Sequence, residues 1–331
     1  MKKIVLGFSG GVDSAVSSVL LQRAGWEVVG LYLDNTDERA RQDAVDTAAF
    51  LSIPLEIRDV HAELEEKVCA PFCASYLRGE TPNPCILCNP AVKFRALLET
   101  ADRLGAEAIA TGHYARAEGG ALYKGRPAND QSYMLCRLRR EQLARLVLPL
   151  GVMEKRETRA LAEAFSLPVA HKRDSMEICF IPDKDYVGWL SRRGELPGPG
   201  PFVFHGEVIG EHAGIVNWTV GQRVPGLHEG RKLYISRIDA AEKSIELALW
   251  EELFKTEVLA RDFNWLIDEP QEPLRASVRV RHTKWEEPRC IATVEGDRVR
   301  IECEEPVRAP APGQSAVLYD GERVLGGGFI M

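Results

Sequence analysis

The sequence lacks long apolar runs and has no surplus of positive charge. It has 331 residues, with 42 Lys and Arg against 49 Asp and Glu, which gives a formal net charge of −7. No stretch approaches the roughly 20 apolar residues of a membrane-spanning helix, and the apolar start Ile4–Phe8 is too short for a signal peptide. The acidic balance argues against a nucleic-acid-binding surface over the whole protein, but not against a local basic face. We therefore expect a cytosolic protein of two or three domains.

Internal repeats and low-complexity tracts are also missing. Apolar residues make up 45% and charged residues 27% of the chain, which excludes a disordered chain, a collagen-like fibre and a small disulfide scaffold. Stable disulfides are rare in a reducing cytosol, so clustered cysteines there indicate metal or sulfur chemistry. The cysteines are Cys69, Cys73, Cys85, Cys88, Cys136, Cys179, Cys290 and Cys303.

The first half of the chain alternates between short apolar runs and segments with helical spacing. This alternation predicts an α/β fold with a parallel sheet covered on both faces, in which ligands bind beyond the carboxyl ends of the strands. The predicted strands are Lys3–Phe8, Val28–Leu33, Leu55–Val60 and Ala108–Thr111, and the predicted helices are Ser14–Ala24, Glu38–Leu51, Lys93–Leu104, Glu141–Leu146 and Lys155–Phe165.

The composition changes at Leu196–Pro201, a Pro- and Gly-rich stretch that we interpret as a linker. Short β-like runs follow, separated by turns rich in Gly, Pro and Asp, and they predict one or two small all-β modules. These runs are Leu233–Ile238, Ile245–Leu249, Ala276–Val280 and Arg298–Glu302.

The segment Ser9-Gly10-Gly11-Val12-Asp13-Ser14 stands between the first predicted strand and the first predicted helix. Glycines let the backbone approach a ligand closely, and a helix start supplies N–H groups and the positive end of a dipole. The loop is therefore a candidate pyrophosphate cradle, with Ser9 and Ser14 as further donors and Asp13 as a ligand for Mg²⁺. The alternative is an ordinary Gly-rich turn with an N-capping side chain. The loop is not of the Walker type, because no lysine follows its glycines.

A second motif, Thr81-Pro82-Asn83-Pro84-Cys85-Ile86-Leu87-Cys88-Asn89, combines two prolines with two cysteines. The prolines fix φ at two positions, which predicts a stiff, non-helical loop. The spacing of Cys85 and Cys88 brings two sulfurs to one metal centre or one redox pair, whereas the alternative is a purely structural pair. Cys179 lies far along the chain, and no second CxxC completes a four-cysteine zinc site.

The glycine loop resembles the PP-loop of the ATP pyrophosphatases, and nearly the whole chain resembles the tRNA-specific 2-thiouridylases, the MnmA family. The matching segments are Ser9–Ser14, Thr81–Asn89, Ala110–Arg116, Asp130–Tyr133, Asp174-Ser175 with Ile178–Ile181, Thr219–Arg223, and Pro312–Gln314 with Leu325–Gly328. The resemblance implies an α/β, parallel-sheet PP-loop catalytic domain, a small β-rich central domain and a C-terminal β-barrel that contacts tRNA. We set their limits at 1–197, 198–254 and 255–331.

The resemblance also implies a reaction, which is thiolation of the wobble uridine in tRNAs for Lys, Glu and Gln with ATP and Mg²⁺. The base is flipped into the site and adenylated at O2 with loss of pyrophosphate, after which sulfur attacks C2 and AMP leaves. Two other interpretations stay open. One is a PP-loop ligase acting on a small molecule, and the other is a non-catalytic tRNA-binding or iron–sulfur-sensing module.

Cys85 departs from the better-known branch of the family, which has Asp at this position. In that branch the residue matching Cys88 is the nucleophile and the residue matching Cys179 carries a persulfide. The added thiolate makes a set of three, as in related tRNA thiolases that hold a [4Fe–4S] cluster. We therefore favour a cluster held by the three cysteines, with the Cys179 persulfide and Cys88 as the alternative. Lys172 and Arg173 are candidates for lowering the pKa of the Cys179 thiol.

Residue by residue, the resemblance implies contacts with ATP and tRNA. The expected ATP-binding residues are Gly7, Phe8, Ser9, Gly10, Gly11, Val12, Asp13, Ser14, Leu33 and Gly112. The expected tRNA-binding residues are Asn83, Pro84, Cys85, His113, Asn129, Asp130, Gln131, Arg281, His282 and Gln314. The family usually has Lys where this chain has Asn129 and Tyr where it has His282, which weakens one phosphate contact and reduces one stacking surface.

Local basic runs are candidate contacts for RNA phosphates, or else ordinary solvated faces. They are Arg137–Arg140, Lys155-Arg156 with Arg159, His171–Arg173, and Arg279 with Arg281 and Lys284. The expected partners are tRNA and a sulfur donor, such as a cysteine desulfurase, a sulfur carrier or free sulfide. The resemblance suggests that the protein acts as a monomer.

The remaining cysteines have weaker signals. Cys69 and Cys73 would share a face of a helix, although Pro71 between them argues against a regular one. We interpret these two as core residues or, alternatively, as additional sulfur carriers. The other three stand in apolar or strand-like contexts and are expected to pack in cores; they are Cys136, Cys290 and Cys303.

Overall fold

The computed structural model describes residues 2–35, 38–172, 178–181, 183–227, 230–282 and 287–331. The chain divides into two compact units, of which the first contains residues 1–68, 85–176 and 322–324, and the second contains residues 69–84, 177–321 and 325–331. The division into 1–197, 198–254 and 255–331 stays a prediction. None of the helices in the described ranges combines the length and apolar character that a membrane span requires.

The first unit is built on a five-stranded parallel sheet in the order β3-β2-β1-β4-β7. The parallel α/β fold predicted from the alternating pattern is therefore confirmed. The strands are β1 (Lys2–Gly7), β2 (Trp26–Asp34), β3 (Leu55–Asp59), β4 (Ala108–Ala110) and β7 (Leu146–Val147).

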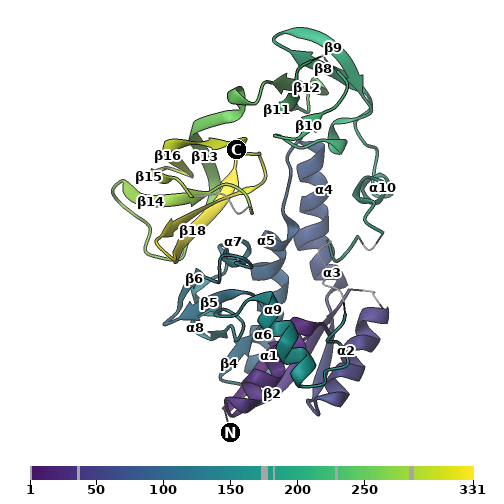
Figure 1. The fold of residues 1–331 in the computed structure, drawn as a ribbon, viewed down its shortest axis with the longest axis vertical. Coiled ribbons are helices and arrows are strands. Elements are labelled where there is room, and N and C mark those ends of the chain that lie inside the picture. The colour runs from purple at the N-terminus through teal and green to yellow at the C-terminus, as the bar shows by residue number, and fades with distance from the viewer. Residues whose placement is uncertain (1, 36–37, 173–177, 182, 228–229, 283–286) are drawn as a thin grey trace. The chain divides into compact units, whose positions relative to one another are not determined.

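Helices pack on the two faces of this sheet (Figure 1). Ile4 and Leu6 on one face of β1 pack with Leu21 of α1 and Ala44 of α2. A Cβ at Gly7 would lie 3.7 Å from a side-chain carbon of Leu97, on α6. Because successive strand residues point to opposite faces, α6 covers the face opposite α1 and α2. The helices of this unit are α1 (Val12–Arg23), α2 (Glu38–Phe50), α3 (His61–Leu64), α5 (Pro84–Cys88), α6 (Phe94–Arg103), α7 (Ser132–Leu135), α8 (Arg140–Ala144) and α9 (Lys155–Ala164), with a hairpin of β5 (Ala115–Glu118) and β6 (Ala121–Lys124).

The predicted loop over Thr81–Asn89 is wrong in its second half. Residues 81–83 are non-helical, but Pro84 begins α5. Proline suits the first position of a helix, where its fixed φ is already helical and its missing N–H has no partner to lose. Pro71 stands in the first turn of α4 (Ala70–Leu77), but Cys69 before it is already helical and belongs to a π-helical turn at Glu65–Cys69. The regular α-helical hydrogen-bond pattern is therefore already interrupted where the proline has no N–H to donate. Leu146, predicted to end a helix, lies instead in β7.

The second unit contains a five-stranded sheet in the order β10-β11-β12-β8-β9. The strands are β8 (Gly200–Phe204), β9 (Glu207–His212), β10 (Arg223–Val224), β11 (Leu233–Asp239) and β12 (Ser244–Ala248). β8 therefore begins inside the predicted linker, of which only residues 196–199 lie outside regular structure. The α4 helix belongs to this unit, and its buried Phe72 packs edge-on against Phe180 and against Trp189 of α10 (Tyr186–Ser191).

The same unit also contains a closed six-stranded β-barrel, as predicted. Its order is β13-β16-β15-β14-β17-β18, and pairing of β13 with β18 closes it. Cys290 and Cys303 face each other between β15 and β16 in the barrel core, where burial raises the pKa of both thiols, to about 12 and about 11. Their predicted packing role is confirmed. The strands are β13 (Phe254–Trp265), β14 (Leu274–Arg279), β15 (Arg289–Glu295), β16 (Arg298–Arg308), β17 (Ser315–Asp320) and β18 (Arg323–Ile330).

Candidate functional site

The glycine loop lies where the order of the parallel sheet reverses. β1 pairs with β2 on one side and with β4 on the other, and the chain runs outward in both directions from this point. The loop follows the carboxyl end of β1 and leads directly into α1. Ligands of open α/β sheets bind at this kind of switch point, so the fold places the predicted phosphate loop where a nucleotide site is expected.

The backbone of the loop requires its glycines. Gly10 has a φ of +66°, and a Cβ there would lie 2.5 Å from both the N and Cα atoms of Ala44 on α2. Gly11 is the N-cap of α1 and supplies no capping side chain, so the loop has no side chain at the position that would cover the first N–H groups. A Cβ at Gly112, after β4, would meet the Cβ of Asp13 at 3.0 Å. These close approaches leave a backbone cradle that suits a phosphate group.

Asp13 is held by two side chains from distant parts of the chain. The Lys155 ammonium lies 2.7 and 2.8 Å from the two carboxylate oxygens of Asp13, and the Tyr114 hydroxyl donates to Oδ1 at 2.6 Å. Tyr114 is 3% exposed, and its hydroxyl lies 3.0 Å from that of Thr158. Sequence reasoning missed Tyr114 in this role and assigned Lys155 to an RNA-facing run. The separations of 101 and 142 residues leave no spacing signal for either contact.

Lys172 also reaches the glycine loop. Its ammonium lies 2.7 Å from a carboxylate oxygen of Asp43 and 3.4 Å from the Gly10 carbonyl oxygen. The ammonium is thus engaged within the first unit, while Cys179, whose thiol it was expected to influence, belongs to the second. Its expected partner in that role, Arg173, lies outside the described residues. Influence of Lys172 on Cys179 stays a prediction.

Cys85 and Cys88 stand one turn apart on a helical path that runs through α5, a π-helical turn at Asn89–Lys93 and α6. Cys85 is exposed and Cys88 is half-buried. Between them Ile86 is fully buried, and the amide of the buried Asn89 donates to the Met134 carbonyl oxygen at 2.9 Å. These buried neighbours hold the helix in place, and so they also fix the backbone positions of Cys85 and Cys88.

The start of α6 lies at the carboxyl edge of the sheet. The ring of Phe94, its first residue, stacks on His113, which follows β4, with a centroid separation of 6.0 Å. The Thr111 hydroxyl lies 2.7 Å from Nδ1 of His113. Burial, together with the nearby Lys93 cation, holds the pKa of His113 well below its usual value of 6.5. His113 is therefore neutral at pH 7. The stacking of Phe94 on His113 also places the helical path that carries Cys88 at the edge of the sheet where the phosphate loop lies.

Cys179 lies in the second unit and is exposed. It is part of a short turn in which the Ile181 N–H donates to the Ile178 carbonyl oxygen at 2.9 Å. The next residue, Phe180, anchors this turn against Phe72 and Trp189. Asp174 and Ser175, part of the same matching segment, lie outside the described residues. Inside the described part of either unit, no three His, Cys, Asp or Glu side chains gather as a metal site.

The predicted tRNA-contacting segment Asn129–Gln131 makes several internal contacts. Asp130 is 7% exposed, and its carboxylate accepts from the N–H groups of Gly125 and Ser132 and from the Ser132 hydroxyl, at 2.9–3.0 Å. The Gln131 side-chain oxygen accepts from the Tyr114 N–H at 2.9 Å. The segment therefore helps to position Tyr114, whose hydroxyl binds Asp13. Its contact with RNA stays a prediction.

The predicted contacts of the C-terminal barrel also have protein partners. The Arg281 guanidinium donates to the carbonyl oxygens of Val220 and Ala309, at 2.6 and 2.7 Å. The Gln314 amide donates to the Thr81 carbonyl oxygen at 2.7 Å, and the Thr81 N–H donates to the Pro312 carbonyl oxygen at 2.8 Å. The matching segments Thr219–Arg223 and Pro312–Gln314 thus brace the second unit from within, while His282 is exposed.

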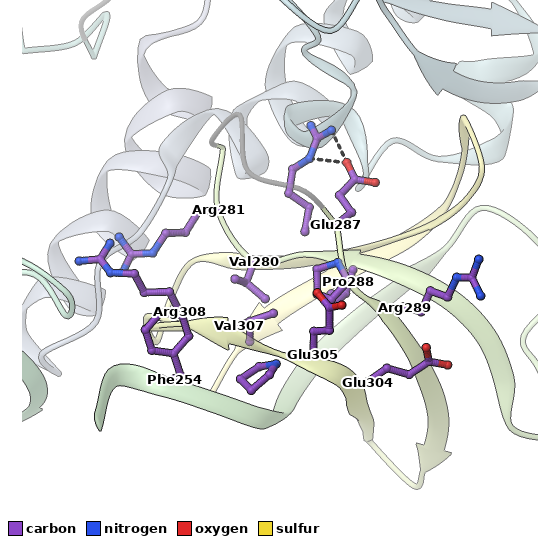
Figure 2. Close-up of a pocket in the computed structure, with 13 residues that line it drawn as sticks. Phe254, Val280, Arg281, Glu287, Pro288, Arg289, Glu304, Glu305, Val307 and Arg308 are labelled. Atoms are coloured by element: carbon purple, nitrogen blue, oxygen red, sulfur yellow. Dashed lines mark hydrogen bonds and ion pairs between the residues drawn. The ribbon is translucent and has the colours of Figure 1, made fainter. Parts of the chain in front are cut away.

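A cavity of about 790 Å³ opens on this barrel (Figure 2). Val280 and Val307 form an apolar part of its lining, and Arg281 and Arg308 lie together at one end. Glu287 forms an ion pair with the Arg279 guanidinium in which both side chains are largely buried. Lys284, the other cation expected near here, lies outside the described residues.

Comparison with known proteins decides the family. The family described as tRNA methyl transferase HUP domain matches residues 2–183, and that described as aminomethyltransferase beta-barrel domain matches residues 255–330. Over 346 residues, the chain is 42% identical to the tRNA-specific 2-thiouridylase MnmA of Syntrophotalea carbinolica, covering 99% of this chain and 98% of that protein. The chain belongs to the MnmA family.

Other members of the MnmA family are similarly close. The MnmA of Rickettsia peacockii is 40% identical over 352 residues, which covers 99% of this chain and 96% of that protein. A solved 4-thiouridine synthetase–RNA complex with bound ATP is more distant, at 18% identity and a TM-score of 0.36, covering 58% of this chain and 50% of that one. The family assignment therefore rests on the full-length relatives and on the matched HUP domain.

Proposed function

We propose that this protein uses ATP to replace O2 of the wobble uridine of tRNA with sulfur, in the tRNAs for Lys, Glu and Gln. The observation that carries the proposal is a convergence within the first unit. The glycine loop and the helical path that bears Cys88 lie at the same edge of the sheet. Phe94, where this path enters α6, stacks on His113, which follows β4 at that edge. Membership of the MnmA family supports this activity over that of other enzymes with a phosphate loop.

The activation step follows from the cradle. Residues Gly7–Ser14 hold the phosphates of ATP, and Leu33 and Gly112 border the nucleoside. The uridine O2 attacks the α-phosphorus, the bond to the β-phosphate oxygen breaks, and pyrophosphate leaves. The adenylated oxygen then departs as AMP when sulfur attacks C2. When bound, Mg²⁺ offsets the phosphate charge. Asp13 is the residue of the loop that would help hold it, and the hydroxyls of Ser9 and Ser14 are further donors to the phosphates.

The wobble base must leave its stack to reach this edge. Asn83-Pro84-Cys85 and His113 meet it, and the neutral imidazole of His113 serves as a stacking or hydrogen-bonding surface without adding charge. RNA phosphates are bound by the local basic runs and by residues 281, 282 and 314 of the barrel. We therefore expect tRNA affinity to fall steeply, by at least tenfold, between about 50 and 200 mM salt. An affinity that barely changes would contradict an electrostatic RNA face.

Two sulfur routes use the exposed Cys85 and Cys179 together with the half-buried Cys88. In the favoured route, the thiolates of Cys85, Cys88 and Cys179 would hold a [4Fe–4S] cluster, and the cluster would supply sulfide for the attack on C2. In the alternative, the terminal sulfur of a Cys179 persulfide attacks C2. Cys88 then attacks Sγ of Cys179, which releases the thiolated base and leaves a Cys88–Cys179 disulfide for an external dithiol to reduce. Cys85 and Cys88 belong to the first unit, and Cys179 belongs to the second.

Iron and acid-labile sulfide content of protein purified without oxygen separates these routes. About four irons per chain are expected, and they should be lost in Cys85→Ala, Cys88→Ala and Cys179→Ala. Cys73→Ala is the matched control, because it removes a half-buried thiol from the second unit and should keep the iron. Protein without iron under these conditions would contradict the cluster and assign the chemistry to Cys88 and Cys179.

Exchange of pyrophosphate into ATP tests the activity itself. Exchange that requires tRNA is expected for wobble-base adenylation. Exchange that proceeds with a small molecule and without tRNA would favour the PP-loop ligase. Binding of tRNA without exchange would favour the non-catalytic module.

The proposal includes a cytosolic monomer, the three domains at 1–197, 198–254 and 255–331, and a sulfur donor that is a cysteine desulfurase, a carrier protein or free sulfide.

A further inference from the structure

The glycine loop has no lysine of its own, yet the fold brings one to it. Walker loops carry a lysine next to their glycines, which reaches the terminal phosphates of the nucleotide. Residues 7–14 contain none. The Lys155 ammonium, 142 residues away in the sequence, lies 2.7 and 2.8 Å from the two carboxylate oxygens of Asp13, in the first turn of α1.

Lys155 is well positioned before any ligand binds. It is the first residue of α9, which packs on α1 through Ala162 and Ala15. Its backbone N–H donates to the side-chain oxygen of Asn129 at 3.2 Å, and its ammonium lies 5.8 Å from the centre of the Tyr114 ring. Only 19% of its side chain is exposed. A cation that is already ordered loses little side-chain entropy when it binds a phosphate.

The neighbouring cation on the same helix behaves differently. The Arg156 side chain is 81% exposed and pairs with Glu154, in the turn that leads into α9. Arg156 is therefore part of the solvated surface, whereas Lys155 is turned inward to the loop. The two adjacent cations therefore differ in exposure and in partner, and only Lys155 contacts the loop.

We propose that Lys155 is the phosphate-binding lysine of this site, supplied by α9 in place of the lysine that the loop lacks. The inference rests on the proposed use of ATP. Negative phosphates entering the cradle meet the Asp13 carboxylate, and the ammonium beside it offsets that repulsion. Its three N–H donors allow Lys155 to keep a contact with Asp13 while it donates to the β- or γ-phosphate. Tyr114 holds Asp13 during this change, because its hydroxyl binds the same carboxylate.

The test compares three ligands in equilibrium dialysis with Mg²⁺: ATP, inorganic pyrophosphate and AMP. Lys155→Gln should weaken binding of ATP and pyrophosphate by about ten- to hundredfold, the usual effect of losing a charge-assisted hydrogen bond, while AMP binding stays within about twofold. Lys155→Arg should recover part of the affinity because it keeps the charge. Lys2→Gln is the matched control, because the exposed Lys2 ammonium pairs with Glu107 at the amino end of β1, away from the loop, and this variant should bind all three ligands as the wild type does.

Each other outcome decides against the inference. Equal loss for ATP and AMP in Lys155→Gln would mean that Lys155 only supports the fold of the site, and unchanged ATP binding would mean that it does not contact phosphate. In both cases the proposed function survives, since the wild type still binds ATP. A wild-type protein that binds neither ATP nor pyrophosphate would overturn the proposed function together with the inference.

Discussion

A single methyl group at Gly10 should show how tightly the phosphate cradle is built. Gly10 has a φ of +66°, and the added Cβ would lie 2.5 Å from the N and Cα atoms of Ala44. Both are backbone atoms of α2, so they cannot rotate away as the tip of a side chain would. Gly10→Ala must therefore push α2 away from the loop or move the start of α1.

The magnitude follows from two terms. A non-glycine residue in the left-handed region costs about 1–2 kcal/mol, and an extra methyl group in a packed region costs about 1–3 kcal/mol. We expect the free energy of unfolding to fall by about 2–5 kcal/mol. Gly105→Ala isolates the first term, because Gly105 has a φ of +61° and no atom within 4 Å of the added Cβ. That variant should lose only about 1–2 kcal/mol.

Urea and thermal unfolding, followed by circular dichroism, measure both variants beside the wild type. Gly10→Ala should also bind pyrophosphate more weakly, because the moved backbone carries the N–H groups of the cradle, whereas Gly105→Ala should bind it normally. Equal destabilisation of the two variants, with normal pyrophosphate binding in both, would refute the close packing of Gly10 against α2.

Three further outcomes are expected. Burial keeps the pKa of His113 well below 6.5, so the unfolded chain binds a proton below about pH 6.5 that the folded chain does not; the stability contribution is full above that pH and decreases as the pH falls. Urea midpoints between pH 5 and 7.5 should fall less in His113→Gln than in the wild type, and parallel profiles would contradict the burial of His113. Asp130→Ala leaves three donors without their acceptor and should lower the free energy of unfolding by about 2–4 kcal/mol, against a change under about 0.5 kcal/mol for the exposed Glu118→Ala. Maleimide labelling of native protein at pH 7.5, read by mass spectrometry, should modify the exposed thiols first and spare those whose pKa burial raises to about 11 or 12; rapid labelling of the second group would disprove its burial. The first group is Cys85 and Cys179, and the second is Cys136, Cys290 and Cys303.

The parallel sheet and the phosphate loop were predictable because their signals are local. Alternating apolar runs and helical spacing specify the layers, and two glycines between a strand and a helix specify an anion cradle at the start of α1. Cys136, Cys290 and Cys303 were correctly expected in cores, because they stand in apolar or strand-like contexts of the sequence. Local signals also have limits, since Pro84 was interpreted as a helix breaker although it begins α5.

The sequence by itself determined the family and the α/β and barrel architecture. These follow from short-range order, in which each residue type acts on its near neighbours. Only the tertiary structure decided that Lys155 and Tyr114 converge on Asp13, and that His113 is held neutral against Phe94. Such contacts join residues brought together by the packing of helices on a sheet, and neither their distances nor their burial is written in the spacing of the chain.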